Sequence, residues 1–282
     1  MSNVPPEGHS NSAAGLHYEV FGSGDPILAI HGLGASNYTW RKLKGRLPDH
    51  RLILIDLKGH GESVKPRDTN YSIPDQAELV LQFIREHDLR NLTVVGNSYG
   101  GAVSLMVAIR LCQEEPERLS KLILICSGGY NQDLPWHLKL IRTPVLGGLA
   151  LHLLPATINT LTVLRYSYYQ KRLISWEQCK AYARPIGSPG GRHALIQVAK
   201  QAVPENFEEL IAQYPTISVP TLLIWGRNDR VIPLSIGERL NRDIPDSKLV
   251  VLDHVGHVPQ EESPEETIAA ILTFLEDPSN VR

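Results

Sequence analysis

Cysteine is scarce in this chain of 282 residues, which contains only Cys112, Cys126 and Cys179. Three cysteines that are far apart fit neither a disulfide framework nor a metal cluster. Free thiols of this kind are typical of proteins in a reducing compartment, so we expect a cytoplasmic protein. The spacing of the histidine, cysteine and acidic residues suggests no metal and no other cofactor.

An uninterrupted apolar segment is also missing. Residues 1–15 have neither the basic start nor the apolar run of a secretory signal peptide, and we expect them to form a flexible leader. Residues 143–164 carry no Asp, Glu, Lys or Arg and have about the 20-residue length that spans a bilayer. Because Pro144, Gly147 and Pro155 interrupt this stretch, we expect short helices packed on protein and no stable membrane insertion.

The chain also lacks a strong net charge, since 28 Lys and Arg residues face 30 Asp and Glu residues, for a formal charge of -2. The basic residues are spread along the sequence. Such a charge offers no field that attracts nucleic acid or an anionic membrane, so we expect no nucleic-acid partner. The 42% of hydrophobic residues and 21% of charged residues are typical of a globular protein.

Short runs of β-branched residues and leucine alternate with longer amphipathic stretches. Strands of this length without polar alternation are buried on both faces, as in parallel sheets. The alternation therefore predicts an α/β fold with a mostly parallel, doubly wound sheet, in which ligands bind outside the carboxyl ends of the strands. The expected strands are residues 16–21 (at the edge), 27–31, 51–56, 92–96, 121–126, 221–225 and 248–252, and the expected helices are residues 37–47, 74–89, 234–242 and 265–275, with one more that ends near residue 114.

Residues 130–215 break this alternation, because they contain no strand of comparable strength and are helical in character. A helix start at Ser175 and a glycine-rich turn at 187–191 fit that reading. We therefore expect a core made of residues 1–129 and 216–282, with a helical domain of residues 130–215 inserted between two strands of one sheet.

Ser98 lies in the pattern G-x-S-x-G at residues 96–100, directly after an expected strand and before an expected helix. A serine on such a tight turn is forced out above the sheet, and small residues on both sides are what the turn requires. Serine is a poor nucleophile at neutral pH and needs a base within hydrogen-bonding reach. Ser98 is therefore our candidate nucleophile.

The candidate base is His257, which lies in the loop after the last expected strand. His254, nearer to the strand, is the alternative. Asp229 follows the strand at 221–225 and is the candidate acid that orients the base, with Asp253 as its competitor. Asp253 lies too close to His257 in sequence to reach the far ring nitrogen comfortably. The order Ser, Asp, His differs from that of chymotrypsin and subtilisin.

A glycine-rich loop follows the early strand, in the sequence Ile-His-Gly-Leu-Gly at residues 30–34. Glycines let a backbone approach a substrate oxygen closely. The backbone N–H of Leu33 can join that of Tyr99, the residue after Ser98, as a donor to a developing oxyanion. The sequence therefore predicts an oxyanion hole formed by Leu33 and Tyr99.

Taken together, these motifs resemble those of the α/β-hydrolase superfamily along most of the chain outside residues 130–215. The resemblance implies the α/β-hydrolase fold, with Ser98 as nucleophile, Asp229 as acid and His257 as base. It also implies that the inserted helices form a cap domain over the active site, and that Asp56 and His60 are structural. The motifs that carry it are HGLG at 31–34, DLKGHGES at 56–63, GNSYGG at 96–101, IWGRNDRVIP at 224–233 and GHVPQEESPEE at 256–266.

Departures from the patterns of individual subfamilies narrow the expected activity. Haloalkane dehalogenases and epoxide hydrolases of this fold need an aspartate where Ser98 stands. The C–C hydrolases that act on meta-cleavage products share the serine triad, but usually carry Trp after the catalytic His, where this chain has Val258. We therefore expect a carboxylesterase, with a C–C bond, lactone or thioester hydrolase as the alternative and a slow-turnover ligand receptor as a lesser one.

The cap is expected to set substrate preference through an apolar pocket. A hydrophobic pocket discriminates weakly between substrates, so we expect small to medium apolar esters as binding partners. We expect the protein to be a monomer or a homodimer. The candidate substrate-binding residues are Trp136, Leu153, Ile158, Tyr168 and Val258.

Overall fold

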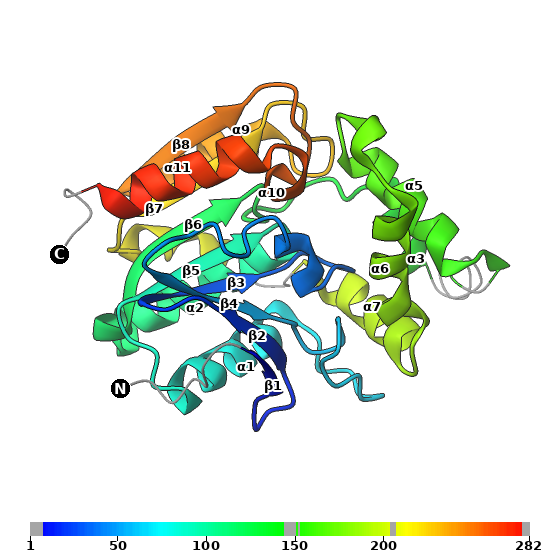
Figure 1. Ribbon diagram of the computed structural model, residues 1–282, viewed down its shortest axis with the longest axis horizontal. Coiled ribbons are helices and arrows are strands. Elements are labelled where there is room, and N and C mark those ends of the chain that lie inside the picture. Colours follow the sequence, from blue (N-terminus) through cyan, green and yellow to red (C-terminus); the bar gives the residue numbers. More distant parts are fainter. Residues whose placement is uncertain (1–7, 144–150, 152, 204–206, 278–282) are drawn as a thin grey trace.

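The computed structural model describes residues 8–143, 151, 153–203 and 207–277. Eight strands form one sheet in the order β1-β2-β4-β3-β5-β6-β7-β8 (Figure 1). The first two strands run antiparallel to their neighbours, and the other six are parallel. The strands are β1 (Gly8–Asn11), β2 (His17–Phe21), β3 (Asp25–Ile30), β4 (His50–Ile55), β5 (Leu92–Asn97), β6 (Leu119–Ile125), β7 (Thr221–Gly226) and β8 (Ser247–Leu252).

The central strands bury side chains on both faces of the sheet, as their continuous apolar sequences predict. In β3, Leu28 and Ile30 belong to the hydrophobic core shared with α1 (Ile73–Glu86), α2 (Tyr99–Glu114) and α9 (Leu234–Asp243). The alternate residues Ile27 and Ala29 belong to a second core on the opposite face, with η1 (Asn37–Trp40) and α11 (Pro264–Glu276). The predicted doubly wound, mostly parallel α/β sheet is therefore confirmed.

Between β6 and β7 the described residues form helices and no strand. Several of these helices lie beside loops at the carboxyl edge of the sheet, and they form one end of the molecule in Figure 1. Among the described residues no helix combines the length and apolar character needed to cross a membrane. Most of the uncharged first half of residues 143–164, namely 144–150 and 152, lies outside the described residues. The described elements between β6 and β7 are α3 (Trp136–Arg142), α5 (Ala156–Ser167), η3 (Lys171–Leu173), α6 (Trp176–Gly187), α7 (Gly191–Gln201), α8 (Phe207–Ile211) and η4 (Tyr214–Thr216).

Two local predictions were wrong. A strand, β1, lies within the expected leader and pairs with β2, so β2 is not the edge strand. The polar residues of β1 are held by backbone pairing and give no hydrophobic pattern to recognise. Residues 37–47 form only the short 3-10 helix η1 followed by turns, because Gly45 has a φ of +70° and Pro48 follows. The remaining short elements are η2 (Pro116–Arg118) and α10 (Pro259–Glu262).

Candidate active site

Ser98 occupies the sharp turn between β5 and α2, where the G-x-S-x-G pattern predicts it. Its backbone has a φ of 58° and a ψ of −120°, a conformation that costs about 1–3 kcal/mol for a residue with a side chain. The turn is tight enough that a Cβ on Gly100 would lie 2.3 Å from the carbonyl oxygen of His31. Glycine at position 100 therefore lets α2 begin directly against β3, with Ser98 projecting above the sheet.

His257 and Asp229 meet Ser98 at this edge. His257 Nε2 lies 2.8 Å from Ser98 Oγ, and His257 Nδ1 lies 2.8 Å from Asp229 Oδ2. The Asp229 side chain is completely buried, and that of His257 is only 7% exposed. The structure thus joins the three side chains in one hydrogen-bonded line, in the order that nucleophilic catalysis by serine requires.

The Asp229 carboxylate is fixed by the turn after β7. Its Oδ1 accepts hydrogen bonds from the backbone N–H groups of Val231, at 2.7 Å, and Ile232, at 3.0 Å. Because Oδ1 is occupied in this way, Oδ2 is left to face the imidazole.

Asn97 ties the Ser98 turn to the His257 loop, a connection that the sequence did not reveal. Its buried side-chain amide donates to the carbonyl oxygens of Ile125, at 3.0 Å, and His257, at 3.3 Å. The backbone N–H of His257 donates in turn to Ser167 at the end of α5, at 2.8 Å. The backbone of the candidate base is therefore held from both the core and the inserted helices.

The predicted oxyanion donors lie on the two loops that meet at Ser98. Tyr99 is the first residue of α2, so its N–H has no partner within the helix. Leu33 follows Gly32, where a Cβ would lie 3.2 Å from Ser98 Cβ. The loop that carries Leu33 therefore runs directly beside the candidate nucleophile.

A buried histidine braces this loop. His31 Nε2 accepts from the backbone N–H of Leu57, at 3.1 Å, which leaves Nδ1 to donate to the Gly32 carbonyl, at 2.8 Å. Burial lowers the pKa of His31 to about 4. The imidazole is thus neutral at physiological pH, and its single ring proton fixes the position of the loop.

The rival residues lie elsewhere. Asp253 is exposed and forms an ion pair with Arg227, and His254 stacks on Tyr169 with their ring centroids 5.8 Å apart.

Asp56 is buried and accepts from the backbone N–H groups of Asn37, at 2.6 Å, and Glu62, at 2.9 Å. Its contacts fit the structural role that the sequence suggests.

One cluster of potential metal ligands includes residues of the same site. The ligand atoms of Cys126, Asp229 and His257 all lie within 4.8 Å of one another. Burial raises the pKa of the Cys126 thiol, so it stays protonated, and Asp229 and His257 already bind each other. A protonated thiol is a poor metal ligand. These contacts favour a hydrogen-bonded triad over a metal centre.

Glu261 in α10 connects the inserted helices to the core through a fully buried carboxylate. From the core, Thr39 donates to it at 2.7 Å and Arg41 forms an ion pair with it. From the inserted segment, Gln178 donates at 2.7 Å, Tyr168 at 3.2 Å, and Tyr182 is also bonded to it. Five side chains therefore converge on one carboxylate at the junction.

Glu262, the next residue, binds backbone rather than side chains. It accepts from the N–H groups of Gly256, at 3.0 Å, Tyr169, at 3.2 Å, and Gln170, at 2.7 Å. Gly256 immediately precedes His257, so Glu262 fixes the loop of the candidate base against the segment that follows α5. Burial raises the pKa of Glu262.

The candidate substrate-binding residues do not line one enclosed pocket. Trp136 is 52% exposed, Leu153 is 70% exposed and Ile158 is 38% exposed, so these side chains face solvent to a large extent. Tyr168 and Val258 are buried in a small apolar cluster with Leu164 and Cys179. A small gap beside the Leu33 loop is lined instead by residues from the second half of the insertion, Pro185, Ile186, Gly191 and Leu195, together with Gly34, Ala35, Gly59 and His60.

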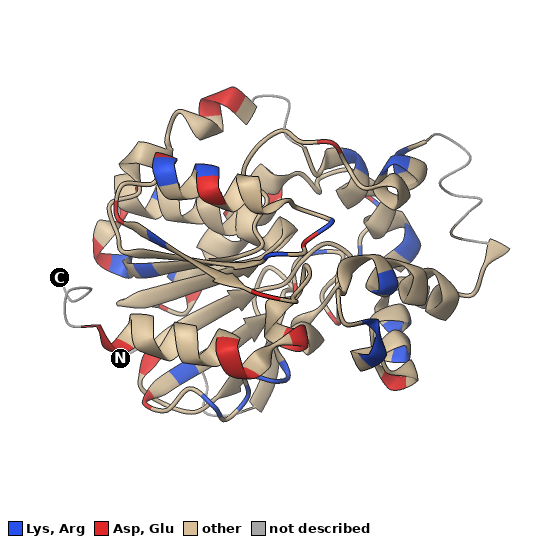
Figure 2. Cartoon of the chain, turned by 90° about the horizontal axis from the view of Figure 1, so that it is seen from above, with Lys and Arg blue, Asp and Glu red and all other residues tan. Residues whose placement is uncertain are grey.

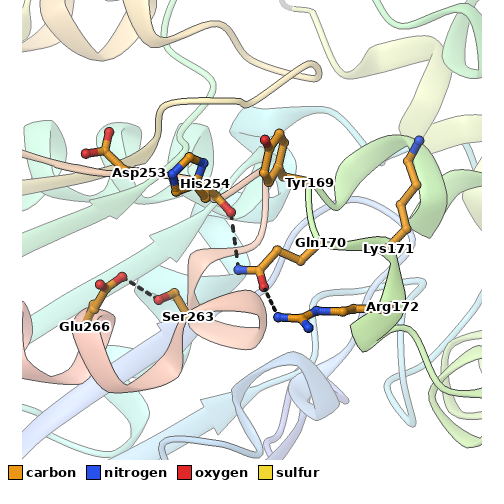
Figure 3. A pocket seen from close by; sticks show the side chains of 8 residues that line it. All are labelled: Tyr169, Gln170, Lys171, Arg172, Asp253, His254, Ser263 and Glu266. Carbon is orange, nitrogen blue, oxygen red and sulfur yellow. Dashed lines mark hydrogen bonds between the residues drawn. The ribbon is translucent and has the colours of Figure 1, made fainter.

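An open hollow of about 650 Å³ lies between the segment that follows α5, the end of the β8 strand and the start of α11 (Figure 3). Neither Ser98 nor His257 lines it. Lys171 and Arg172 project at one side of it and Asp253 at another, so its walls carry both signs of charge. We do not assign it to the chemistry of Ser98. Its lining residues are Tyr169, Gln170, Lys171, Arg172, Asp253, His254, Ser263 and Glu266.

Comparison with known proteins shows consistent similarity. Residues 25–264 match the family model for the alpha/beta hydrolase fold. An uncharacterized hydrolase of Bacillus subtilis, YugF, is 30% identical over 271 residues, which cover 92% of each chain. Lipase 3 of a Moraxella species is 28% identical over 87% of this chain and 75% of its own length. The 2-hydroxy-6-oxo-2,4-heptadienoate hydrolase of Pseudomonas putida is 28% identical over 98% of this chain and 99% of its own.

Proposed function

Because the chain belongs to the alpha/beta-hydrolase fold family and is a hydrolase, we propose that it cleaves carboxylic esters of small to medium apolar substrates through an acyl-enzyme on Ser98. The observation that carries this proposal is the line from Ser98 Oγ through the His257 ring to Asp229, with 2.8 Å at each contact. The similarity to Lipase 3 supports ester cleavage as the reaction.

In the proposed first step, Ser98 Oγ attacks the ester carbonyl carbon while His257 Nε2 takes the hydroxyl proton. Asp229 accepts from Nδ1–H, holds the ring in the required tautomer and stabilises the imidazolium that forms. The tetrahedral intermediate then collapses, and His257 returns the proton to the leaving alcohol. In the second step a water molecule, activated by the same imidazole, hydrolyses the ester formed on Ser98 and releases the acid.

The N–H groups of Leu33 and Tyr99 are the proposed donors to the oxyanion. Both lie on backbone that is held before substrate arrives, one beside Gly32 and the other at the start of α2. The positive end of the α2 dipole points at the same space. Loss of one such donor typically lowers the rate by about 10²–10³-fold.

We further propose that residues 130–215 act as a cap domain on a core of residues 1–129 and 216–282. The contacts that support this are the ones at the edge of the site, where Ser167 accepts from the N–H of His257 and Leu195 approaches Gly34. A substrate would then enter between the Leu33 loop and α6–α7. The apolar side chains of Ile186 and Leu195 at that place favour an uncharged group.

A C–C bond hydrolase is the second candidate, and the full-length similarity to the heptadienoate hydrolase favours it. The same triad can serve both reactions. Val258 follows the proposed base in this chain, and it is buried against Leu164 and Tyr168. Which class of substrate the protein cleaves, an ester or a vinylogous diketone, distinguishes the esterase from the C–C bond hydrolase.

The test is turnover on a panel of p-nitrophenyl esters and, in parallel, on a vinylogous 1,5-diketone. Ester turnover that disappears in Ser98→Ala supports the proposal, whereas cleavage of the diketone alone assigns the C–C reaction. His257→Gln and His254→Gln form a matched pair in one loop. We expect roughly a 10⁴-fold or larger loss of kcat in His257→Gln and little change in His254→Gln. Equal loss in both variants contradicts the assignment of the base.

A further inference from the structure

The net charge of -2 conceals two oppositely charged parts of the molecule. Residues 136–201, which contain α3, α5, α6 and α7, hold nine Lys and Arg residues and a single acidic residue, Glu177. The rest of the chain holds 19 basic and 29 acidic residues. The spread of basic residues along the sequence therefore does not show this difference, because 25 of the 30 acidic residues lie in the core, residues 1–129 and 216–282.

Many of these cations are free to meet a partner. Arg165, Lys171 and Lys180 are exposed and have no ion pair among the described residues. Lys139 pairs with Asp133, just before α3, and Arg184 pairs with Glu62 of the core. Figure 2 shows Lys and Arg as the main charged residues at this end of the molecule.

The same end carries nearly all of the exposed large apolar side chains. Of the nine such residues in the described parts of the chain, only Val64 lies outside residues 136–176. The other eight are Trp136, Leu140, Leu153, Leu154, Ile158, Tyr169, Leu173 and Trp176. Such a concentration of exposed apolar surface is unusual on a protein that contacts only water.

Exposed cations and exposed apolar side chains lie close together in the sequence of these elements. Lys139 lies between Trp136 and Leu140 in α3, and Lys171 and Arg172 lie between Tyr169 and Leu173. Tryptophan, leucine and basic residues on one surface are the combination that binds a membrane interface, where the apolar groups enter the headgroup region and the cations meet lipid phosphates. A nucleic acid or an acidic protein would use the charges but leave the leucines in water.

We propose that the exposed surface of α3, α5, η3 and the start of α6 docks on an anionic lipid bilayer. Docking is peripheral, since the described residues contain no helix that could cross a membrane. It does not depend on ester cleavage, because it uses side chains that are exposed to solvent, whereas Ser98, Asp229 and His257 are not part of it.

Co-sedimentation of the full chain with lipid vesicles tests this proposal. We expect binding to vesicles that contain phosphatidylglycerol, weak binding to pure phosphatidylcholine, and weakening as salt is raised. The triple variant Arg165→Gln/Lys171→Gln/Arg172→Gln should bind on the order of 100-fold more weakly. Leu153→Ser/Leu154→Ser should lower binding by more than about tenfold at unchanged charge.

The matched control is Lys42→Gln/Arg242→Gln/Lys248→Gln, which removes the same charge from exposed positions of the core. It should leave vesicle binding nearly unchanged, and the thermal unfolding midpoint of each variant reports whether it folds. Equal losses in the cap and core triple variants would overturn the proposal, as would equal binding to neutral and anionic vesicles. Retention on immobilised polyglutamate without vesicle binding would also overturn it, in favour of an acidic protein partner.

Discussion

At the scale of single residues, the strained backbone of Ser98 depends on two neighbours, Gly100 and Asn97. Gly100 lets helix α2 approach β3, and Asn97 bonds to the two carbonyl groups on the far side of the turn. Strain of this kind persists only where the surroundings determine it. We therefore regard Asn97 as a positioning residue for both Ser98 and His257.

Asn97→Ala should lower both stability and turnover. The substitution removes the side-chain donor to the buried His257 carbonyl, which costs about 1–3 kcal/mol in the free energy of unfolding. The Ile125 carbonyl loses the same donor but keeps the backbone N–H of Ser98, at 3.1 Å. The substitution also removes the contact that holds the His257 backbone from the core side, so we expect kcat to fall while KM for a soluble ester changes little. Denaturant unfolding and steady-state kinetics measure the two effects. Asn97→Asp should be worse than Asn97→Ala, because it places an acceptor against two carbonyl oxygens.

The buried histidines predict a loss of stability in acid. Burial lowers the pKa of His31 to about 4 and that of His60 to about 3, from an unfolded value near 6.5. Between these values the unfolded chain binds the protons that the folded chain does not. The free energy of unfolding should therefore fall as pH drops below about 6.5, by up to about 1.4 kcal/mol per unit for each histidine.

Denaturant unfolding between pH 7 and pH 4 measures this slope. In His60→Gln the slope of the free energy of unfolding against pH should decrease by the contribution of one histidine, up to about 1.4 kcal/mol per pH unit. The unsubstituted protein, measured in the same buffers, is the control. An unaltered slope in His60→Gln would show that His60 is already protonated in the folded protein or does not titrate on unfolding.

The residue types in the proposed triad were predictable because each lies in a short local pattern. Ser98 stands in a strand–turn–helix sequence, and Asp229 and His257 each follow a strong apolar strand. The role of Asn97 was not predictable, since it depends on carbonyls 28 and 160 positions away in the chain. Hydrogen bonds between distant segments leave no periodicity in a sequence.

At the scale of elements, the four-residue helix α10 connects the inserted helices to the core. The Glu261 carboxylate binds two side chains of the core, Thr39 and Arg41. It also binds three side chains of the inserted segment, namely Tyr168, Gln178 and Tyr182. Glu262 binds the loop that carries His257. The position of α6 and the position of the proposed base are thus set by two adjacent residues.

Glu261→Ala should be strongly destabilising. It leaves Arg41 without its partner and removes the acceptor of the buried Tyr182 hydroxyl, and breaking a buried ion pair in this way typically costs about 3–5 kcal/mol. Glu261→Gln keeps the shape and should cost less. Denaturant unfolding measures both variants. Glu265→Ala, on the exposed start of α11, is the control and should have little effect; a similarly small effect of Glu261→Ala would refute the role of Glu261 as the anchor.

Elements with strong apolar patterns were predicted well, and weakly patterned ones were not. The strands β3 to β8 follow from short apolar runs, and the helices α1, α2, α9 and α11 follow from the longer stretches between and after them. Strand β1 consists of polar residues that pair only through their backbone with β2, and the expected helix at 37–47 contracts to η1. Backbone pairing at a sheet edge is decided by the neighbouring strand, which the local sequence does not contain.

At the scale of the whole molecule, the alternation of strands and helices was enough to predict the fold and the carboxyl edge where the site lies. The walls of the substrate pocket were not predictable. The packing of one inserted helix on another decides which apolar side chains are buried, and Trp136, Leu153 and Ile158 are exposed instead. The charge separation between the inserted helices and the core appears only when charges are counted by structural segment.

The central claim is that His257 and Asp229 make Ser98 a nucleophile. Incubation with an alkyl fluorophosphonate, followed by intact-mass and peptide mass spectrometry, tests it directly, because this reagent bonds to activated serines. The account predicts one adduct per chain, on the peptide that contains Ser98, and none in folded Ser98→Ala. A wild-type chain that stays unlabelled, or a label that persists in Ser98→Ala, would contradict it.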